Sequence, residues 1–180
     1  MKSLQEKQKL TTYDITLMGL MVAMIEACKM ALSGLPNVEL TSFWIIMFTI
    51  FFGKKILFVI PAFILVEGCI YGFGLWWIMY LYAWPLLALV AWCIREKDSV
   101  WLYSIISALF GLFFGMLCSI PYFFIGCAEG GVTTGFSTAF TWWIAGIPWD
   151  LVHCAGNFVI MLVLYKPIRN VMKKIVVKNM

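Results

Sequence analysis

The sequence predicts an all-α integral membrane protein with six transmembrane helices in one bundle and both termini in the cytoplasm. Hydrophobic residues make up 63% of the 180 residues and charged residues 12%, whereas soluble domains are about 45–50% apolar and about 25% charged. Runs such as residues 56–73 and 76–94 are apolar on every face, as expected of a helix that bonds its own backbone in lipid. With one exception, the basic residues fall in alternate segments between such runs, a pattern typical of multi-span proteins.

The individual helices follow from the apolar runs and from the breaks between them. A span needs about 20 mostly apolar residues, and the runs are interrupted by segments containing Gly, Pro or charges. We predict spans at residues 14–34, 40–53, 56–74, 76–94, 100–124 and 138–165, of which the second is short. They form one membrane domain, 14–165, between a cytoplasmic tail at 1–13 without a signal-peptide pattern and a basic cytoplasmic tail at 166–180.

The lysines and arginines orient these spans. Twelve of the thirteen lie in the two tails or in the loops after spans two and four: Lys2, Lys7, Lys9, Lys54, Lys55, Arg95, Lys97, Lys166, Arg169, Lys173, Lys174 and Lys178. Because positively charged loops remain in the cytoplasm, the loops at 33–40, 73–77 and 126–138 are expected outside. The last of these is long and rich in Gly and Thr, and we expect it to form a lid over a pocket.

A few polar side chains interrupt the apolar spans, where a charge is costly and commonly faces the protein interior. Glu26 and Lys29 are three residues apart on one helix, so either they form a local ion pair or one of them contacts a substrate. Asp150, His153 and Asn157 share a face of the last span. This face predicts either a polar cluster that docks the helix or a set of ligand contacts.

The sequence contains no convincing signature of catalysis or of a cofactor. Asp150 and His153 lack a placed nucleophile such as a GxSxG elbow. One histidine and six cysteines without paired spacing argue against a metal site, a haem site or a disulfide framework. A phosphate-binding loop is also missing, and the cytoplasmic loops are too short for a nucleotide-binding domain. We expect no catalytic residue, no metal, no cofactor and no nucleic-acid partner.

A ridge of small residues follows one side of the first span. Gly19, Ala23, Ala27 and Ala31 recur every four residues, which permits the close approach of another helix. That helix belongs either to this chain or to a partner in the bilayer.

Three stretches carry a family resemblance: GLMVAMIEA (19–27), LPNVEL (35–40) and GIPWDLVHCAGNFVIMLVLYKPI (146–168). In this order within a six-span chain, they resemble the substrate-binding S-components of energy-coupling factor (ECF) vitamin transporters. The resemblance implies a non-enzymatic subunit of the bacterial plasma membrane that captures a vitamin or related micronutrient outside. It also implies a transmembrane coupling protein, contacted through Gly19, Ala23 and Ala27, and two cytoplasmic ATPases as partners. Glu26, a charge beside this ridge, departs from the family pattern.

The resemblance places a substrate site in the outer half of the bundle. On this sequence it nominates Asn37, Glu39, Trp76, Trp77, Tyr80, Trp84, Tyr122, Glu129, Trp142, Trp143, Trp149, Asp150, His153 and Asn157. Five acidic residues and one basic residue, Lys29, lie in this half, which favours a neutral or weakly cationic aromatic substrate over a polyanion. Flavin, pyridoxine, thiamine, a deazaguanine and cobalamin fit this description. The long 126–138 loop favours cobalamin, since it would accommodate a bulky ligand.

Two other classes of function stay open on the sequence. A small membrane scaffold would use the ridge only to bind a partner helix and would have no substrate. A membrane enzyme would use Asp150 and His153, and would lose its turnover when His153 is replaced. A stoichiometric small molecule in the purified protein would favour the transport subunit over both.

Overall fold

The part of the chain that the computed structural model describes, residues 10–178 with side chains to 175, is helical and contains no strand. The all-α prediction is confirmed. Lys2, Lys7 and Lys9, and the side chain of Lys178, lie outside the described residues. The elements are α1 (Thr12–Ala31), α2 (Thr41–Phe52), the short 3₁₀ helix η1 (Gly53–Lys55), α3 (Ile56–Tyr71), α4 (Leu75–Cys93), α5 (Val100–Cys118) and α6 (Ile120–Lys178).

Local side-chain chemistry starts and ends several of these helices. At the start of α1 the Thr11 hydroxyl accepts from the Asp14 backbone N–H at 3.1 Å, and the Asp14 carboxylate accepts from the Thr11 N–H at 3.0 Å. This reciprocal arrangement satisfies two backbone donors that the helix leaves free. Gly72, with φ 89°, ends α3 in a conformation that side-chain-bearing residues rarely adopt.

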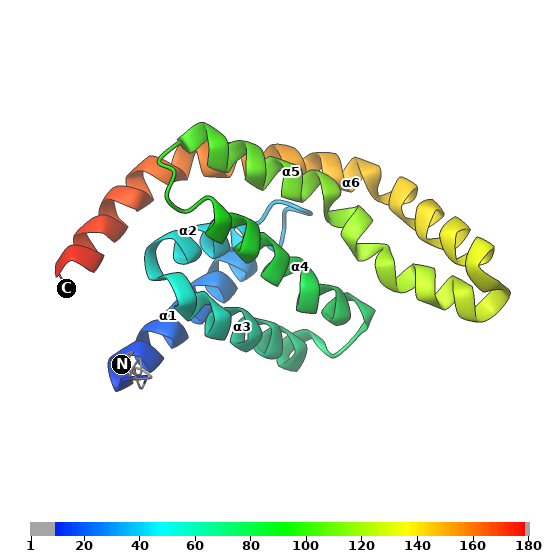
Figure 1. Cartoon of the computed structure of the whole chain (residues 1–180), viewed down its shortest axis with the longest axis horizontal. Coiled ribbons are helices and arrows are strands. Elements are labelled where there is room, and N and C mark those ends of the chain that lie inside the picture. Colours follow the sequence, from blue (N-terminus) through cyan, green and yellow to red (C-terminus); the bar gives the residue numbers. More distant parts are fainter. Residues whose placement is uncertain (1–9, 179–180) are drawn as a thin grey trace, which may run out of the picture.

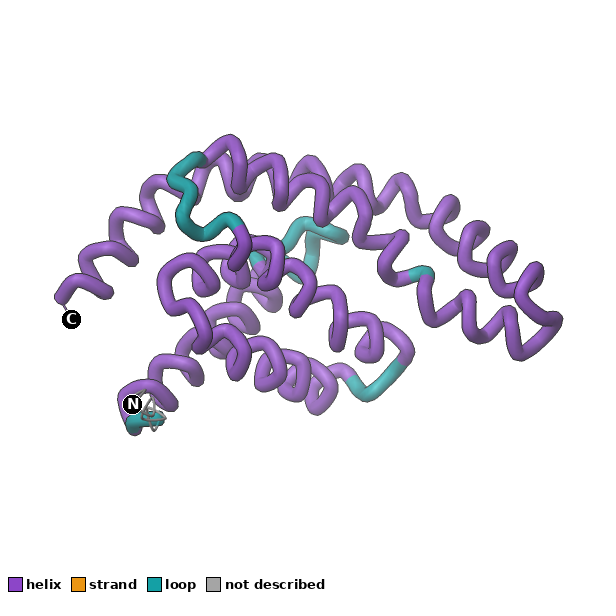
Figure 2. Tube along the Cα trace, viewed as in Figure 1, coloured by secondary structure: helices purple, strands orange, loops and turns teal. Residues whose placement is uncertain are grey.

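The helices form two groups that pack against each other. In Figure 1, α1 to α4 make a compact group on one side, and α5 lies along α6 across the top of it. The α6 segment is a hairpin, because Gly130 and Gly131 leave helical geometry. Residues 120–129 continue the direction of α5, and residues 132–178 return alongside both (Figures 1 and 2).

The prediction of a loop at residues 126–138 that forms a lid is wrong, because this segment is helical except at the Gly130–Gly131 turn. Gly131 reverses the chain with φ 81°. The small residues that suggested a loop instead let two helical arms touch: a Cβ on Gly126 would lie 2.9 Å from the Cα of Gly135. Glycine and threonine here are packing residues, as they commonly are between membrane helices.

Three helical segments of the described chain are long and apolar enough to cross a membrane: Thr41–Tyr71, Leu75–Cys93 and Val100–Ile175. The first holds a reversal at Gly53, where φ is 57°, so α2 and α3 run in opposite directions (Figure 1). With 12 residues, α2 is about 18 Å long, well short of the ~30 Å hydrocarbon core. The third holds the hairpin turn. These segments are compatible with a membrane protein.

The basic segments gather at one end of the molecule. The start of α1, the α2–α3 turn, the α4–α5 loop and the C-terminal end all lie on the left in Figure 1. Lys55 of η1 reaches Asp14 of α1 at 2.6 Å, and Arg169 of α6 pairs with Asp98 in the α4–α5 loop. Ion pairs at this end thus join segments that are far apart in the sequence.

Candidate functional site

The candidate site is a cavity of about 430 Å³ among the last turn of α1, the α1–α2 loop, the end of α3, the first half of α4 and one residue of α5. All the helix ends that surround it lie away from the basic loops. Its lining combines charged and aromatic side chains: Lys29, Leu32, Ser33, Leu35, Pro36, Asn37, Val38, Glu39, Glu67, Tyr71, Trp76, Tyr80, Trp84 and Phe114. A cavity of about 300–1,000 Å³ with a few placed polar groups is the general form of a small-molecule site.

One wall of the cavity is an aromatic stripe on α4. Trp76, Tyr80 and Trp84 are spaced four residues apart and therefore share one face of the helix. Each neighbouring pair of rings meets edge-on with centroids 5.2 Å apart, a favoured aromatic geometry. Phe114 of α5 packs against Trp84 with centroids 5.6 Å apart. The stripe gives a flat apolar ligand a stacking surface.

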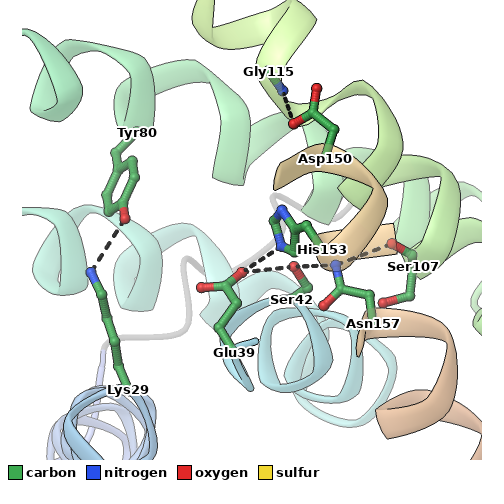
Figure 3. Close-up of polar contacts among 9 residues, drawn as sticks. All are labelled: Lys29, Glu39, Ser42, Tyr80, Ser107, Gly115, Asp150, His153 and Asn157. Atoms are coloured by element: carbon green, nitrogen blue, oxygen red, sulfur yellow. Dashed lines mark hydrogen bonds and ion pairs between the residues drawn. The ribbon is translucent and has the colours of Figure 1, made fainter. Parts of the chain in front are cut away.

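Lys29 forms an ion pair with Glu67 of α3. Its ammonium also donates to the Tyr80 hydroxyl at 3.2 Å (Figure 3). The local pair with Glu26, one of the two alternatives open on the sequence, is therefore not formed. Both carboxylate oxygens of Glu26 are buried without a hydrogen-bond donor. α1 packs against α3, which brings Glu67 within reach of Lys29.

Glu39 connects the cavity to the polar face of α6. Its Oε1 atom lies 3.2 Å from His153 Nε2 and accepts from the Ser42 hydroxyl at 3.2 Å. Because a carboxylate only accepts, the His153 nitrogen in this contact carries the proton. Asn157 Nδ2 continues the chain by donating to the Ser42 hydroxyl at 3.3 Å and to the Ser107 carbonyl at 3.2 Å (Figure 3).

The environment of Glu39 keeps its carboxyl group ionised. Burial raises the pKa of Glu39, but the hydrogen bond from His153 and the positive charge of Lys29 nearby contribute to lowering it, and this pKa falls below its usual value. Glu39 therefore presents a negative charge to the cavity at neutral pH.

Asp150 does not line the cavity; it holds α6 against α5. It is buried, and its Oδ1 accepts from the Gly115 backbone N–H at 2.9 Å. A Cβ on Gly115 would lie 2.3 Å from Asp150 Oδ2, and a Cβ on Gly111 would lie 2.8 Å from the backbone of His153. Gly111 and Gly115 thus form a GxxxG contact through which α5 approaches α6. The sequence analysis missed this motif, although its spacing in an apolar segment is a recognised signal.

The structure brings five of the nominated residues to the cavity and leaves the others elsewhere. Asn37, Glu39, Trp76, Tyr80 and Trp84 line it, and His153 stands directly behind Glu39. The remaining aromatic residues and Glu129 belong to other surfaces. Trp77 donates to a backbone carbonyl of α3, Tyr122 stacks on Trp142 in the hairpin, Trp143 lines the hairpin's outer groove and Trp149 is 54% exposed.

The nominations missed the charged and aromatic lining residues Lys29, Glu67, Tyr71 and Phe114, as well as five smaller residues of the α1–α2 segment, Leu32, Ser33, Leu35, Pro36 and Val38. Lys29 and Glu67 carried a signal, since a charge within an apolar span marks a functional position. No feature of the sequence distinguishes Tyr71 and Phe114 from the many other aromatic residues of the chain.

Comparison with known proteins gives no match, whether to a family model, to a curated protein or to a solved structure.

Proposed function

We propose that the protein is the substrate-binding S-component of an ECF-type importer, which captures a small aromatic micronutrient outside the cell and passes it inward with an ATPase-driven partner complex. The observation that carries this proposal is the cavity, with its aromatic stripe and its charged residues Lys29, Glu39 and Glu67. The resemblance of the three sequence stretches supports the same assignment.

The distribution of basic residues supports an outward-facing cavity. Lysines and arginines mark cytoplasmic loops, and the loops that carry them gather at one end of the molecule. The cavity is built from the opposite ends of α1, α3 and α4. In the proposed topology the chain crosses a bacterial plasma membrane six times, with both termini in the cytoplasm and the cavity facing outside.

The dimensions of the cavity favour a small substrate. Its volume of about 430 Å³ lies in the lower half of the usual range for small-molecule sites. The preference for cobalamin relied on a long outer loop at 126–138, and these residues form a helical hairpin instead. We therefore propose a compact planar compound of the size of pyridoxine, thiamine or a deazaguanine.

The ridge on α1 supports a partner in the bilayer. Gly19, Ala23 and Ala27 are all exposed, and no atom lies within 4 Å of a Cβ built on Gly19. Packing among the residues that the structure describes therefore does not account for the ridge. We propose that it receives the transmembrane coupling protein, which in turn carries two cytoplasmic ATPases. The same exposed ridge is what favours the second candidate function, a membrane scaffold without a substrate.

Purification in mild detergent followed by mass spectrometry of bound small molecules tests the proposal. We expect a stoichiometric aromatic micronutrient in the native protein and its loss from a Trp76→Ala variant. The matched control is Trp149→Ala, which removes a tryptophan that faces away from the cavity. Protein that binds a coupling partner through α1 yet never retains a small molecule would support the scaffold instead.

A further inference from the structure

The ammonium group of Lys29 is enclosed by aromatic rings. It lies 5.0 Å from the ring centroid of Tyr80, 5.5 Å from that of Tyr71 and 5.9 Å from that of Phe63. All three distances are within the range of about 6 Å in which a ring attracts a cation. With the Glu67 carboxylate beside it, this aromatic cage has the chemistry of the sites that bind alkylammonium ligands.

Two buried carboxyl groups, those of Glu26 and Glu67, share this part of the molecule with the single ammonium group of Lys29. Glu67 is fully buried and lines the cavity, and its Oε1 atom has no hydrogen-bond partner in the part of the chain that the structure describes. Glu26 is also buried, with neither carboxylate oxygen bonded to a donor, and it lies close enough to interact with Glu67. Buried acceptors without donors are costly. A ligand with a positive charge and N–H groups would satisfy them.

Lys29 is the movable member of this group. Its side chain is 24% exposed at the cavity, whereas that of Glu67 is 1% exposed, and a lysine stem has four rotatable bonds and a strong tendency to return its ammonium to water. Tyr71 is half exposed, so the cage opens toward the rest of the cavity. Farther along, the buried Nε1–H of Trp84 has no acceptor, which leaves a donor for a polar atom at the other end of a ligand.

We infer that the aromatic cage is a cation subsite of the cavity, in which Lys29 is a tethered stand-in that the ammonium or protonated ring nitrogen of an aromatic ligand displaces. The inference deepens the proposed function, on which it rests in taking this cavity as the substrate site. It assigns the ligand to the class of aromatic amines and cationic heterocycles.

Binding of phenethylammonium to the detergent-purified protein tests this inference, with phenethyl alcohol as the uncharged probe of similar shape. Quenching of tryptophan fluorescence reports the affinity. In Lys29→Ala the cage is vacant, so the ammonium probe is expected to bind about tenfold more tightly than in the unmodified protein, where it must first displace Lys29. The alcohol should not distinguish the two proteins. Weaker binding of the ammonium to Lys29→Ala would overturn the inference, as would an equal gain for the alcohol.

A second variant shows that any gain comes from the cage. In Lys29→Ala/Glu67→Gln the carboxylate is gone, and the preference for phenethylammonium over the alcohol should disappear; a preference that persists would overturn the inference. If Lys29→Ala does not fold, Lys29→Met keeps the apolar stem and takes its place. Saturating phenethylammonium should then raise its melting temperature by about 3 °C, and equal stabilisation by the alcohol would overturn the inference.

The outcomes separate this inference from the proposed function. Retention of a native micronutrient that carries no positive charge, together with no gain for phenethylammonium in Lys29→Ala, would leave an importer subunit without a cation subsite. A clear gain in a protein that retains no micronutrient and joins no coupling protein would support the subsite and contradict the importer.

Discussion

Glu39 and His153 are 114 residues apart in the chain, and their side chains meet at 3.2 Å. This contact fastens the α1–α2 loop, which forms one wall of the cavity, to the last helix of the protein. The polar face of α6 therefore supports the cavity from behind, since His153 contacts both Glu39 and the ring of Phe114 in its lining.

The Glu39–His153 contact makes stability depend on pH. The folded protein holds the pKa of Glu39 below its usual value, so between the two pKa values the unfolded chain binds more protons and stability rises with pH. We expect Glu39→Gln to lower the free energy of unfolding by about 1–3 kcal/mol at pH 7. The gap to the unmodified protein should shrink as the pH falls below about 4.3, where Glu39 of the unfolded chain begins to bind a proton while that of the folded protein stays ionised.

Thermal unfolding in detergent at pH 7, 5 and 3 measures this gap. Glu96→Gln serves as the control, because the Glu96 side chain is 84% exposed and its pair with Arg95 is solvated. A Glu39→Gln gap that stays constant over this range would contradict the role given to the ionised carboxylate.

Close approach of α5 and α6 makes Gly115 intolerant of a side chain. A Cβ there would lie 2.3 Å from Asp150 Oδ2, so Gly115→Ala should destabilise the protein by about 1–3 kcal/mol through overpacking. Gly146→Ala is the matched control on α6, because nothing lies within 4 Å of its Cβ. There, alanine should be neutral or stabilising by up to about 1 kcal/mol. Equal melting temperatures for the two variants would refute the close contact.

Asn157 is expected to support the fold rather than touch the ligand. It is buried, bonded to Ser42 and Ser107, and absent from the cavity lining. Asn157→Ala should therefore cost about 1–3 kcal/mol of stability by leaving buried groups unpaired, while the folded fraction keeps its affinity for the retained ligand. Trp76→Ala should show the reverse, with weaker binding and nearly unchanged stability. Ligand titration of both variants below their melting temperatures makes the comparison.

If the exposed ridge on α1 binds a partner helix, a bulky substitution there should prevent partner binding without affecting ligand binding. Ala27→Trp places a large ring where a partner helix would approach, so co-purification with the coupling protein should be lost while ligand binding remains. Ile105→Trp is the control, since Ile105 is an exposed side chain on α5. Loss of ligand binding in Ala27→Trp alone would instead mean that this surface supports the fold of the cavity.

The polar face of the last helix illustrates how far sequence reasoning reached. The spacing of Asp150, His153 and Asn157 predicted one shared face, and all three side chains are buried together between α6 and its neighbours. The partners of these side chains lie on α2 and α5. The spacing along α6 contains no information about those helices, so it does not tell which of the three residues lies nearest a ligand site. The prediction of a loop at residues 126–138 was wrong for a related reason, because glycines are equally suited to a loop and to a tight helix–helix contact.

The sequence by itself determined the all-helical class with long apolar segments, the alternation of basic and uncharged segments and the small-residue ridge, because hydrophobicity and helical periodicity are local properties of the chain. Only the tertiary structure decided that Lys29 pairs with Glu67 rather than Glu26, and that Glu39 meets His153. Such partners are chosen by how helices pack, over separations of 38 and 114 residues. The same packing decides which of many aromatic rings surround a cavity and which face outward.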